Sequence, residues 1–239
     1  MGFRKILRRV GWALIGCALL VFAFLAYQLF VTDLLNDRLQ AQAMEQLDDE
    51  LAERRVELPE PEIVEVVEEK TTTTTVVRAE LLKESAGEIG STLGRISIPA
   101  IDVDEVMFEG VDTETLKKGP GHMPWTPVPG QPGNAVISGH RTTYGRPFYD
   151  LDQLVEGDRI EVETALGTHV FEVRHSIVVK PTDVWVTEDR PGAWLTLTTC
   201  HPHFSAAERL IIQAELVEGP NHAYAELVRL HGGGPEQRT

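Results

Sequence analysis

Residues 194–217 read WLTLTTCHPHFSAAERLIIQAELV, and this stretch contains two runs in which apolar and polar residues alternate. Alternation with a period of two is typical of β-strands that bury one face. In the first run it directs Leu195 and Leu197 to a core and puts Cys200 on the polar side, at the end of the strand. In the second run it directs Leu210, Ile212, Ala214 and Leu216 to a core and Arg209 away from it.

Short runs of alternating apolar and polar residues continue over residues 92–218, which we interpret as one structured domain. The runs GRISIPAI, DEVMFEG, NAVISGH, DRIEVETA and THVFEVRHSIVV are further strand candidates, separated by turn clusters such as PVPGQPGN. Thr113 to Lys118 is the one helical candidate among them. Seven to eight short strands in a domain of this size predict an all-β fold, a closed or nearly closed β-barrel with short helices.

Upstream, residues 10–31 read VGWALIGCALLVFAFLAYQLFV, which is 22 residues without a charge. A helix of that length is about 33 Å long, enough to cross a bilayer core of about 30 Å. Residues 1–9 contain four basic residues and no acid, which predicts a cytoplasmic N-terminus and an extracellular position for the rest of the chain. A cleaved secretory signal is the alternative, but its apolar region would be shorter and end in a small-residue cleavage site.

Three further segments surround the predicted domain. Residues 32–57 are expected to form an amphipathic juxtamembrane helix, residues 58–91 an extended acidic, threonine-rich linker, and residues 219–239 a flexible tail. The helix prediction rests on an apolar stripe at four-residue intervals, Leu35, Leu39, Ala43, Leu47 and Leu51.

Charge and cysteine content limit the classes of function. With 37 acidic and 22 basic residues the chain carries a net charge of -15, which argues against a nucleic-acid partner. Its two cysteines are Cys17, inside the predicted span, and Cys200. Cys200 therefore has no intrachain partner on its side of the membrane, and is a reactive thiol, an intermolecular disulfide or a buried inert residue. The spacing to His201 and His203 matches no usual zinc site, so we expect neither a metal nor a cofactor.

Two other residues, like Cys200, stand at the end of a predicted strand and on its polar face. His140 ends the run NAVISGH on the face of Ser138, and Arg209 begins the last run. A thiol with a pKa of about 8.5 needs a base or a cation nearby to become a nucleophile, and an imidazole can take its proton. A guanidinium can hold a substrate carbonyl and the oxyanion that forms from it. Arg141 directly follows His140 and is expected on the opposite face.

These residues carry a family resemblance. TLTTC, followed nine residues later by Arg209, with GHR in an upstream strand, resembles the signature of the sortases, and the similarity covers roughly residues 92–217. The stretches TTCHPHFSAAERL and HRTTYGRPF are most similar to class E sortases of high-GC Gram-positive bacteria. The resemblance implies a sortase-like β-barrel behind a single transmembrane helix and a stalk.

The resemblance also implies an activity, that of a cysteine transpeptidase of the hydrolase class. Such an enzyme cleaves a C-terminal sorting motif of the LAxTG or LPxTG type in secreted proteins between Thr and Gly. It then passes the protein to an amine of a lipid II-like cell-wall precursor. By matched position Cys200 is the nucleophile, His140 the general acid and base, and Arg209 the oxyanion clamp. The substrate-binding candidates are Thr198, Thr199 and Tyr144, although Tyr144 is equally well an ordinary loop aromatic.

Two other interpretations remain open at this level. An L,D-transpeptidase-like enzyme also uses an exported cysteine and histidine, but its S-x-G-C-x-R pattern is absent because Thr198 and Thr199 precede Cys200. A membrane-tethered scaffold without activity would bury Cys200. The other histidines, His122, His169 and His175, are expected in turns or at the surface.

Overall fold

The computed structural model describes residues 2–27, 32–56, 60–70 and 73–231. The described residues leave out residue 1, residues 28–31 of the predicted span, residue 57 of the predicted juxtamembrane helix, residues 58–59 and 71–72 of the predicted linker and residues 232–239 of the predicted tail. The helices are α1 (Gly2–Ala26), α2 (Thr32–Val56), α3 (Thr113–Leu116) and α4 (His222–His231). The strands are β1 (Glu62–Lys70), β2 (Thr73–Leu81), β3 (Thr92–Ile98), β4 (Val103–Glu109), β5 (Gly121–His122), β6 (Gly133–Ser138), β7 (Arg159–Thr164), β8 (Gly167–Val179), β9 (Ala193–His201) and β10 (Glu208–Glu218).

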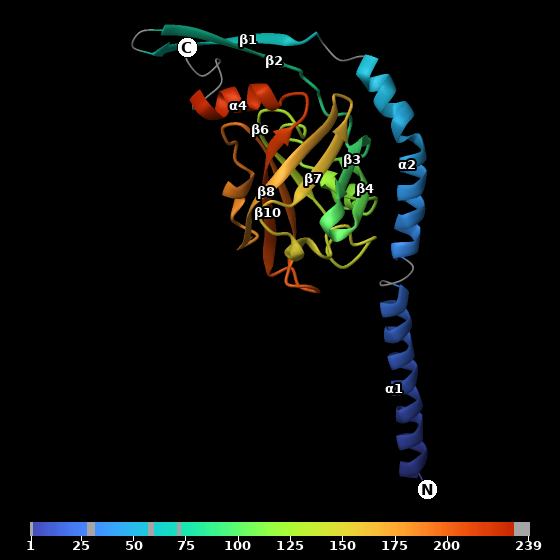
Figure 1. The fold of residues 1–239 in the computed structure, drawn as a ribbon. Helices are drawn as coiled ribbons and strands as arrows, with labels where there is room; N and C mark the ends of the chain where they lie inside the picture. The colour runs from blue at the N-terminus through green and yellow to red at the C-terminus, as the bar shows by residue number, and fades with distance from the viewer. Residues whose placement is uncertain (1, 28–31, 57–59, 71–72, 232–239) are drawn as a thin grey trace.

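Strands β3 to β10 close into a barrel in the order β10-β8-β7-β3-β4-β5-β6-β9, which confirms the predicted fold class (Figure 1). Most neighbours are antiparallel, but β4 with β5 and β6 with β9 are parallel pairs. Strand β5 has two residues and was not predicted, because so short a strand leaves no alternating pattern.

The barrel interior contains the apolar residues that alternation assigned to it. Leu195 and Leu197 of β9 lie in one buried cluster with alternate residues of the last strand, namely Leu210, Ile212, Ala214 and Leu216. The two strands that carry Cys200 and Arg209 are therefore fixed by their inner faces, and the polar residues at their ends are turned away from the core.

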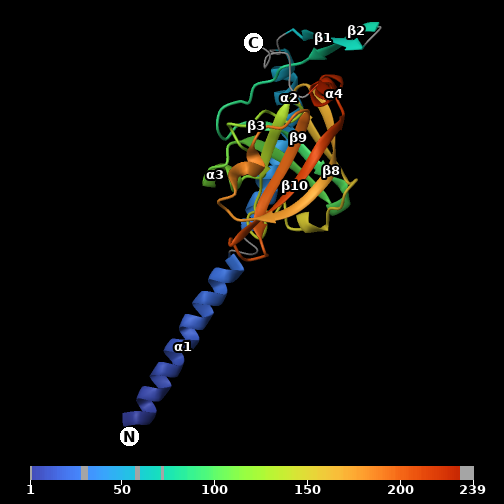
Figure 2. The ribbon, with the colours of Figure 1, turned by 90° about the vertical axis from the view of Figure 1, so that its left-hand side faces the viewer.

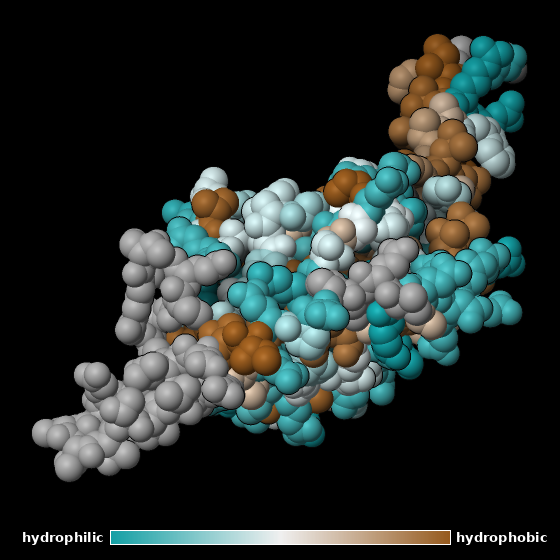
Figure 3. Space-filling model, turned by 90° about the horizontal axis from the view of Figure 1, so that it is seen from above, coloured by the Kyte–Doolittle hydropathy of each residue, from teal (hydrophilic) through white to brown (hydrophobic). Residues whose placement is uncertain are grey.

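Helix α1 is exposed along its length, and its segment Phe3–Leu25 is long and apolar enough to cross a bilayer. Figures 1 and 2 show it projecting from the barrel, and brown apolar residues gather along it in Figure 3. A helix that exposes apolar side chains on all sides is unfavourable in water, since burial of that area is the main driving force of folding.

Helix α2 packs along the barrel, but not through the whole predicted stripe. Leu47 and Leu51 are buried in a cluster with Val106, Phe108 and Ala165 of the barrel, whereas Leu35 and Leu39 are 49% and 46% exposed. A step of four residues advances about 400° around a helix with 3.6 residues per turn, so each step drifts by about 40°. Leu35 and Leu51 therefore cannot share a face, and the polar residues Asn36 and Gln40 are buried near the start of α2 instead.

The predicted linker and tail also contain structure. Strands β1 and β2 form an antiparallel hairpin, and α4 packs on it through one apolar cluster (Figure 1). The buried amide of Asn221 joins the two, since it accepts from Leu82 N and donates to the carbonyls of Leu82 and Gly130. The expectation of a spacer and a tail without regular structure is wrong over these elements, because the hairpin and α4 bury apolar side chains against each other. The cluster consists of Val64, Ala79, Leu81, Tyr224, Leu227 and Val228.

Candidate functional site

Cys200 and Arg209 are direct neighbours across two antiparallel strands. The register of β9 with β10 pairs their Cα atoms, so the two side chains emerge side by side on the same face. Cys200 is a free, half-buried thiol. The structure therefore brings together the predicted nucleophile and the predicted oxyanion clamp.

His140 reaches the same end of the barrel along the other neighbour of β9. Strand β6 runs parallel to β9 with Ser138 opposite Thr198, and Gly139 N donates to the Thr198 carbonyl at 3.1 Å. His140 follows directly and therefore lies level with the end of β9 that carries Cys200. A side chain at Gly139 would collide with the Phe148 ring, because a Cβ built there lies 2.5 Å from it.

The environment of His140 suits a general base. The ring is mostly buried, and its Nε2 has no hydrogen-bond partner among the described residues. Burial lowers the pKa of His140 below its ordinary value, so the imidazole is neutral at pH 7. A neutral imidazole with an unpaired nitrogen can accept a proton from a thiol or return one to a leaving amine.

Arg209 keeps most of its donors available. Its Nη1 donates to the carbonyls of Ala206 and Glu208 at 3.1 and 2.9 Å, and no described carboxylate forms an ion pair with it. The guanidinium is thus anchored at one nitrogen by the turn before β10. Its charge and remaining N–H groups are available to an oxygen that becomes negative beside Cys200.

Arg141 has a different environment from that of Arg209. It is only 2% exposed, and its Nη2 lies 2.8 Å from Asp152 Oδ2. Its Nε donates to the Tyr149 carbonyl at 3.1 Å, and its Nη1 contacts the Cys200 carbonyl and His201 Nδ1. Arg141 therefore ties the backbone on both sides of the site together. The sequence could not show this, since its partners come from two separate segments, residues 149–152 and 200–201.

The three substrate-binding candidates lie in different positions. Thr198 is half-buried and shares the face of Cys200, whereas Thr199 is buried and donates its hydroxyl to the Gly139 carbonyl at 2.7 Å. This bond favours a positioning role for Thr199 rather than a substrate contact. The Tyr144 ring lies beside His140, with ring centroids 5.1 Å apart.

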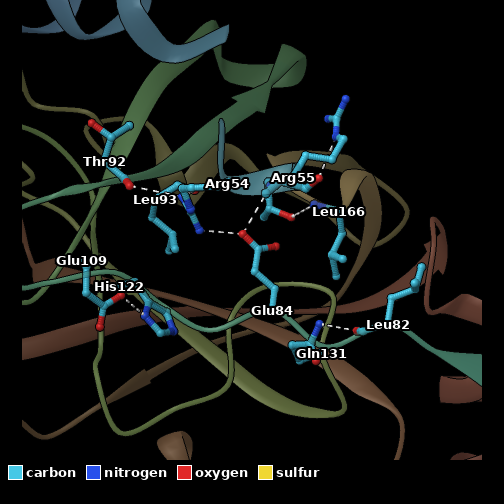
Figure 4. Close-up of polar contacts among 12 residues, drawn as sticks. Arg54, Arg55, Leu82, Glu84, Thr92, Leu93, Glu109, His122, Gln131 and Leu166 are labelled. Atoms are coloured by element: carbon cyan, nitrogen blue, oxygen red, sulfur yellow. Dashed lines mark hydrogen bonds and ion pairs between the residues drawn. The ribbon is translucent and has the colours of Figure 1, made fainter. Parts of the chain in front are cut away.

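Two other histidines are not at the surface, which corrects that expectation. His122 is fully buried, with its Nδ1 2.6 Å from the buried Glu109 Oε2 (Figure 4). Its Nε2 lies 2.9 Å from the Pro127 carbonyl. His169 is also fully buried, and only His175 is exposed. His122 and His169 are buried because the residues that pair with them or pack on them come from other segments of the chain, which the local sequence does not reveal. Over the described residues, no group of three His, Cys, Asp or Glu side chains has the geometry of a metal site.

Comparison with known proteins gives a consistent result. A sequence model of the sortase domain matches residues 96–217. Sortase SrtE1 of Streptomyces coelicolor is 28% identical over 229 residues, and the match covers 88% of this chain and 57% of that protein. The chain thus spans a little over half the length of this relative.

Solved structures agree. A point mutant of sortase E from Streptomyces avermitilis matches with a TM-score of 0.51 and 33% identity, over 55% of this chain and 91% of that chain. Sortase C of Clostridium perfringens, solved with the C-terminal cell wall sorting motif, matches with a TM-score of 0.52 and 28% identity, over 55% of this chain and 73% of that chain.

Proposed function

Because the chain belongs to the sortase family, whose members are cysteine transpeptidases, we propose that Cys200 cleaves a sorting motif of secreted proteins and transfers the protein to an amine. The observation that carries this proposal is the pairing of Cys200 with Arg209 across β9 and β10, level with His140, whose Nε2 has no partner among the described residues. The similarity to a sortase solved with its sorting motif supports a peptide substrate of this type.

The first half of the reaction forms a thioester. The Cys200 sulfur attacks the carbonyl carbon of the motif threonine while the thiol proton passes to His140 Nε2. The carbonyl oxygen becomes negative in the tetrahedral intermediate, and the guanidinium of Arg209 stabilises it. When the intermediate collapses, the Thr–Gly bond breaks and the glycine amine leaves with the proton from His140.

The second half reverses these roles. An acceptor amine attacks the thioester carbonyl, gives a proton to His140, and forms a new amide bond as the thiolate of Cys200 leaves. The proton then returns from His140 to the sulfur, so the enzyme is regenerated without a cofactor. An amine of a lipid II-like cell-wall precursor fits this step, since a membrane-bound acceptor and a membrane-bound enzyme meet at one surface.

Tyr144 and Thr198 are proposed to contact the motif. Tyr144 flanks the imidazole, so its ring can limit the side chain two residues before the threonine and favour alanine of LAxTG over the bulkier proline of LPxTG. Thr198 lies two residues before Cys200 on the same face, where an extended peptide would pass. Thr199 instead fixes β9 to the residue before His140.

Helix α1 is proposed to anchor the enzyme in the membrane. The four basic residues near its N-terminus support a cytoplasmic N-terminus and a barrel outside the cell. This position also gives the barrel access to secreted proteins and to cell-wall precursors.

The test uses the full chain in detergent micelles with LAxTG and LPxTG peptides and an amine acceptor, followed by chromatography of the products. Arg209→Lys should lower kcat/KM by about 100-fold or more, because one ammonium cannot replace the guanidinium fork at the oxyanion. The matched control is Arg159→Lys, since Arg159 lies in β7 and forms only a surface ion pair with Glu218.

The expected product contains a new amide bond between the motif threonine and the acceptor amine. We expect a higher kcat/KM for the LAxTG peptide than for the LPxTG peptide, and wild-type activity in the Arg159→Lys control. Near-normal turnover of Arg209→Lys would remove Arg209 from the site. Absence of any product with both peptides would refute the proposed activity.

A further inference from the structure

The loop that carries Tyr144 has an unusual backbone conformation. Tyr144, Gly145 and Arg146 have positive φ angles of 53°, 76° and 52°. Three consecutive left-handed residues, two of them with side chains, are disfavoured in an isolated chain and persist only when the surroundings hold them. The position of Tyr144 beside His140 therefore depends on contacts from outside the loop.

The first turns of α2 supply these contacts. Asp33 accepts a hydrogen bond from Gly145 N to its Oδ1 at 3.1 Å, and its Oδ2 lies 3.1 Å from Arg146 Nε. Asn36 is 2% exposed and packs against Gly145, because a Cβ at Gly145 would come within 2.0 Å of Asn36 Oδ1. Two of the three left-handed residues thus have a direct partner in α2.

Asn36 also fixes a second segment that lies near Tyr144. Its Nδ2 donates to the carbonyls of Lys117 and Lys118 at 2.9 Å each. The Lys117 ammonium lies 6.0 Å from the centroid of the Tyr144 ring, at the outer limit of a cation–π contact. The segment after α3 and the loop of Tyr144 are therefore fixed by one buried amide.

The rest of α2 keeps these residues in place. Gln40 exchanges hydrogen bonds with both the N–H and the carbonyl of Val106 in β4. At the other end of the helix, Arg54 donates to the Leu93 carbonyl at 2.8 Å and pairs with Glu84 at 2.6 Å (Figure 4). Both ends of α2 are thus hydrogen-bonded to the barrel domain. A segment that only connected the membrane to the barrel would not need these contacts.

From this arrangement we propose that Asp33 and Asn36 are positioning residues of the active site, which hold Tyr144 against His140 and so set the affinity for the sorting motif. The inference rests on the proposed function for its effect on substrate. Only six residues lie between Ala26, the end of α1, and Asp33, so the two are at most about 25 Å apart. The same helix therefore links the proposed membrane anchor to the substrate loop and keeps the mouth of the site near the bilayer surface.

The test compares Asp33→Ala with the wild-type full chain in nanodiscs, by steady-state kinetics on an LAxTG peptide and by hydrogen exchange of the segment around Gly145. We expect KM to rise about tenfold or more with a smaller fall in kcat, since a hydrogen bond to a charged group is lost at the loop and not at the reacting atoms. The Gly145 amide should exchange at least about tenfold faster, because Asp33 is its acceptor. Asp49→Asn, which removes an exposed carboxylate from the same helix, should behave as wild type in both measurements.

Rescue separates positioning from a general loss of structure. The exchanged pair Asp33→Arg with Arg146→Asp restores an ion pair and should recover part of the lost affinity, whereas Arg146→Ala should add little to Asp33→Ala. Wild-type KM and wild-type exchange in Asp33→Ala would overturn the inference. If the wild type itself turned over no peptide, the proposed function would fail, and the exchange of Gly145 would still decide whether Asp33 holds the loop.

Discussion

His169 predicts how the stability of the barrel depends on pH. This side chain in β8 is fully buried, and its Nδ1 has no hydrogen-bond partner among the described residues. Its Nε2 lies 3.3 Å from Thr164 Oγ1, and its ring packs so closely on Gly130 that a Cβ there would lie 2.2 Å from it. Burial lowers the pKa of His169 from 6.5 to about 4. The folded protein therefore resists protonation of this ring.

The sign and size of the effect follow from linkage. Between pH 6.5 and 4 the unfolded chain binds a proton at His169 that the folded chain does not, so the free energy of unfolding falls as the pH falls. A difference of about 2.5 pKa units corresponds to about 3 kcal/mol, most of which is lost by pH 4. This loss is a large part of the stability of a typical domain, about 5 to 15 kcal/mol.

The assay is urea unfolding of the wild type and of His169→Gln at pH 7, 5.5 and 4. Glutamine stays neutral, so the difference in unfolding free energy between the two proteins should shift by about 3 kcal/mol in favour of the variant from pH 7 to pH 4. His175→Gln, an exposed site on the same strand, should show no such shift. Parallel pH curves for wild type and His169→Gln would refute the reasoning.

Three further predictions concern single residues. Burial, with Asp37 nearby, raises the pKa of Glu105 to about 7, so the free energy of unfolding falls as the pH rises from 4.5 to 7 and the buried carboxyl ionises. In urea unfolding over that pH range, the free energy of unfolding of Glu105→Gln should gain about 2 to 3 kcal/mol relative to the wild type. A difference between the two proteins that does not change with pH would contradict this prediction. Glu109→Gln replaces the carboxylate beside the buried His122 with an amide and should cost about 1 to 3 kcal/mol, whereas an unchanged free energy of unfolding would disprove the pairing. Arg141→Lys cannot reproduce the contacts of the guanidinium, so acylation of Cys200 should slow about tenfold or more; an unchanged rate would show that Arg141 does not position the site.

The sequence was sufficient for the barrel and for the strand ends that form the site. Alternation assigns Leu195 and Leu197 to the core and Cys200 and Arg209 to the other face, and the register of β9 with β10 then pairs Arg209 with the thiol. Periodicity is a local signal, which is why it works for strands that bury one face.

The features that could not be predicted from the sequence depend on contacts between segments that are distant along the chain. The burial of His122 requires Glu109 on a neighbouring strand, and the hairpin of β1 and β2 requires the apolar side of α4. The prediction that the apolar stripe of α2 lies on one face was wrong for a geometric reason, because residues spaced four apart shift steadily around a helix with 3.6 residues per turn. The polar residues Asp33 and Asn36, which contact the loop of Tyr144, carry no apolar signal at all.

The central claim, that Cys200 performs acyl transfer with His140 and Arg209, is tested most directly by the intact mass of the full chain after brief incubation with an LAxTG peptide. The account predicts an adduct with the mass of the peptide up to its threonine, located on Cys200, labile to hydroxylamine and absent from Cys200→Ala. An adduct of the same yield in Cys200→Ala, or its absence from the wild type with both LAxTG and LPxTG peptides, would contradict the account.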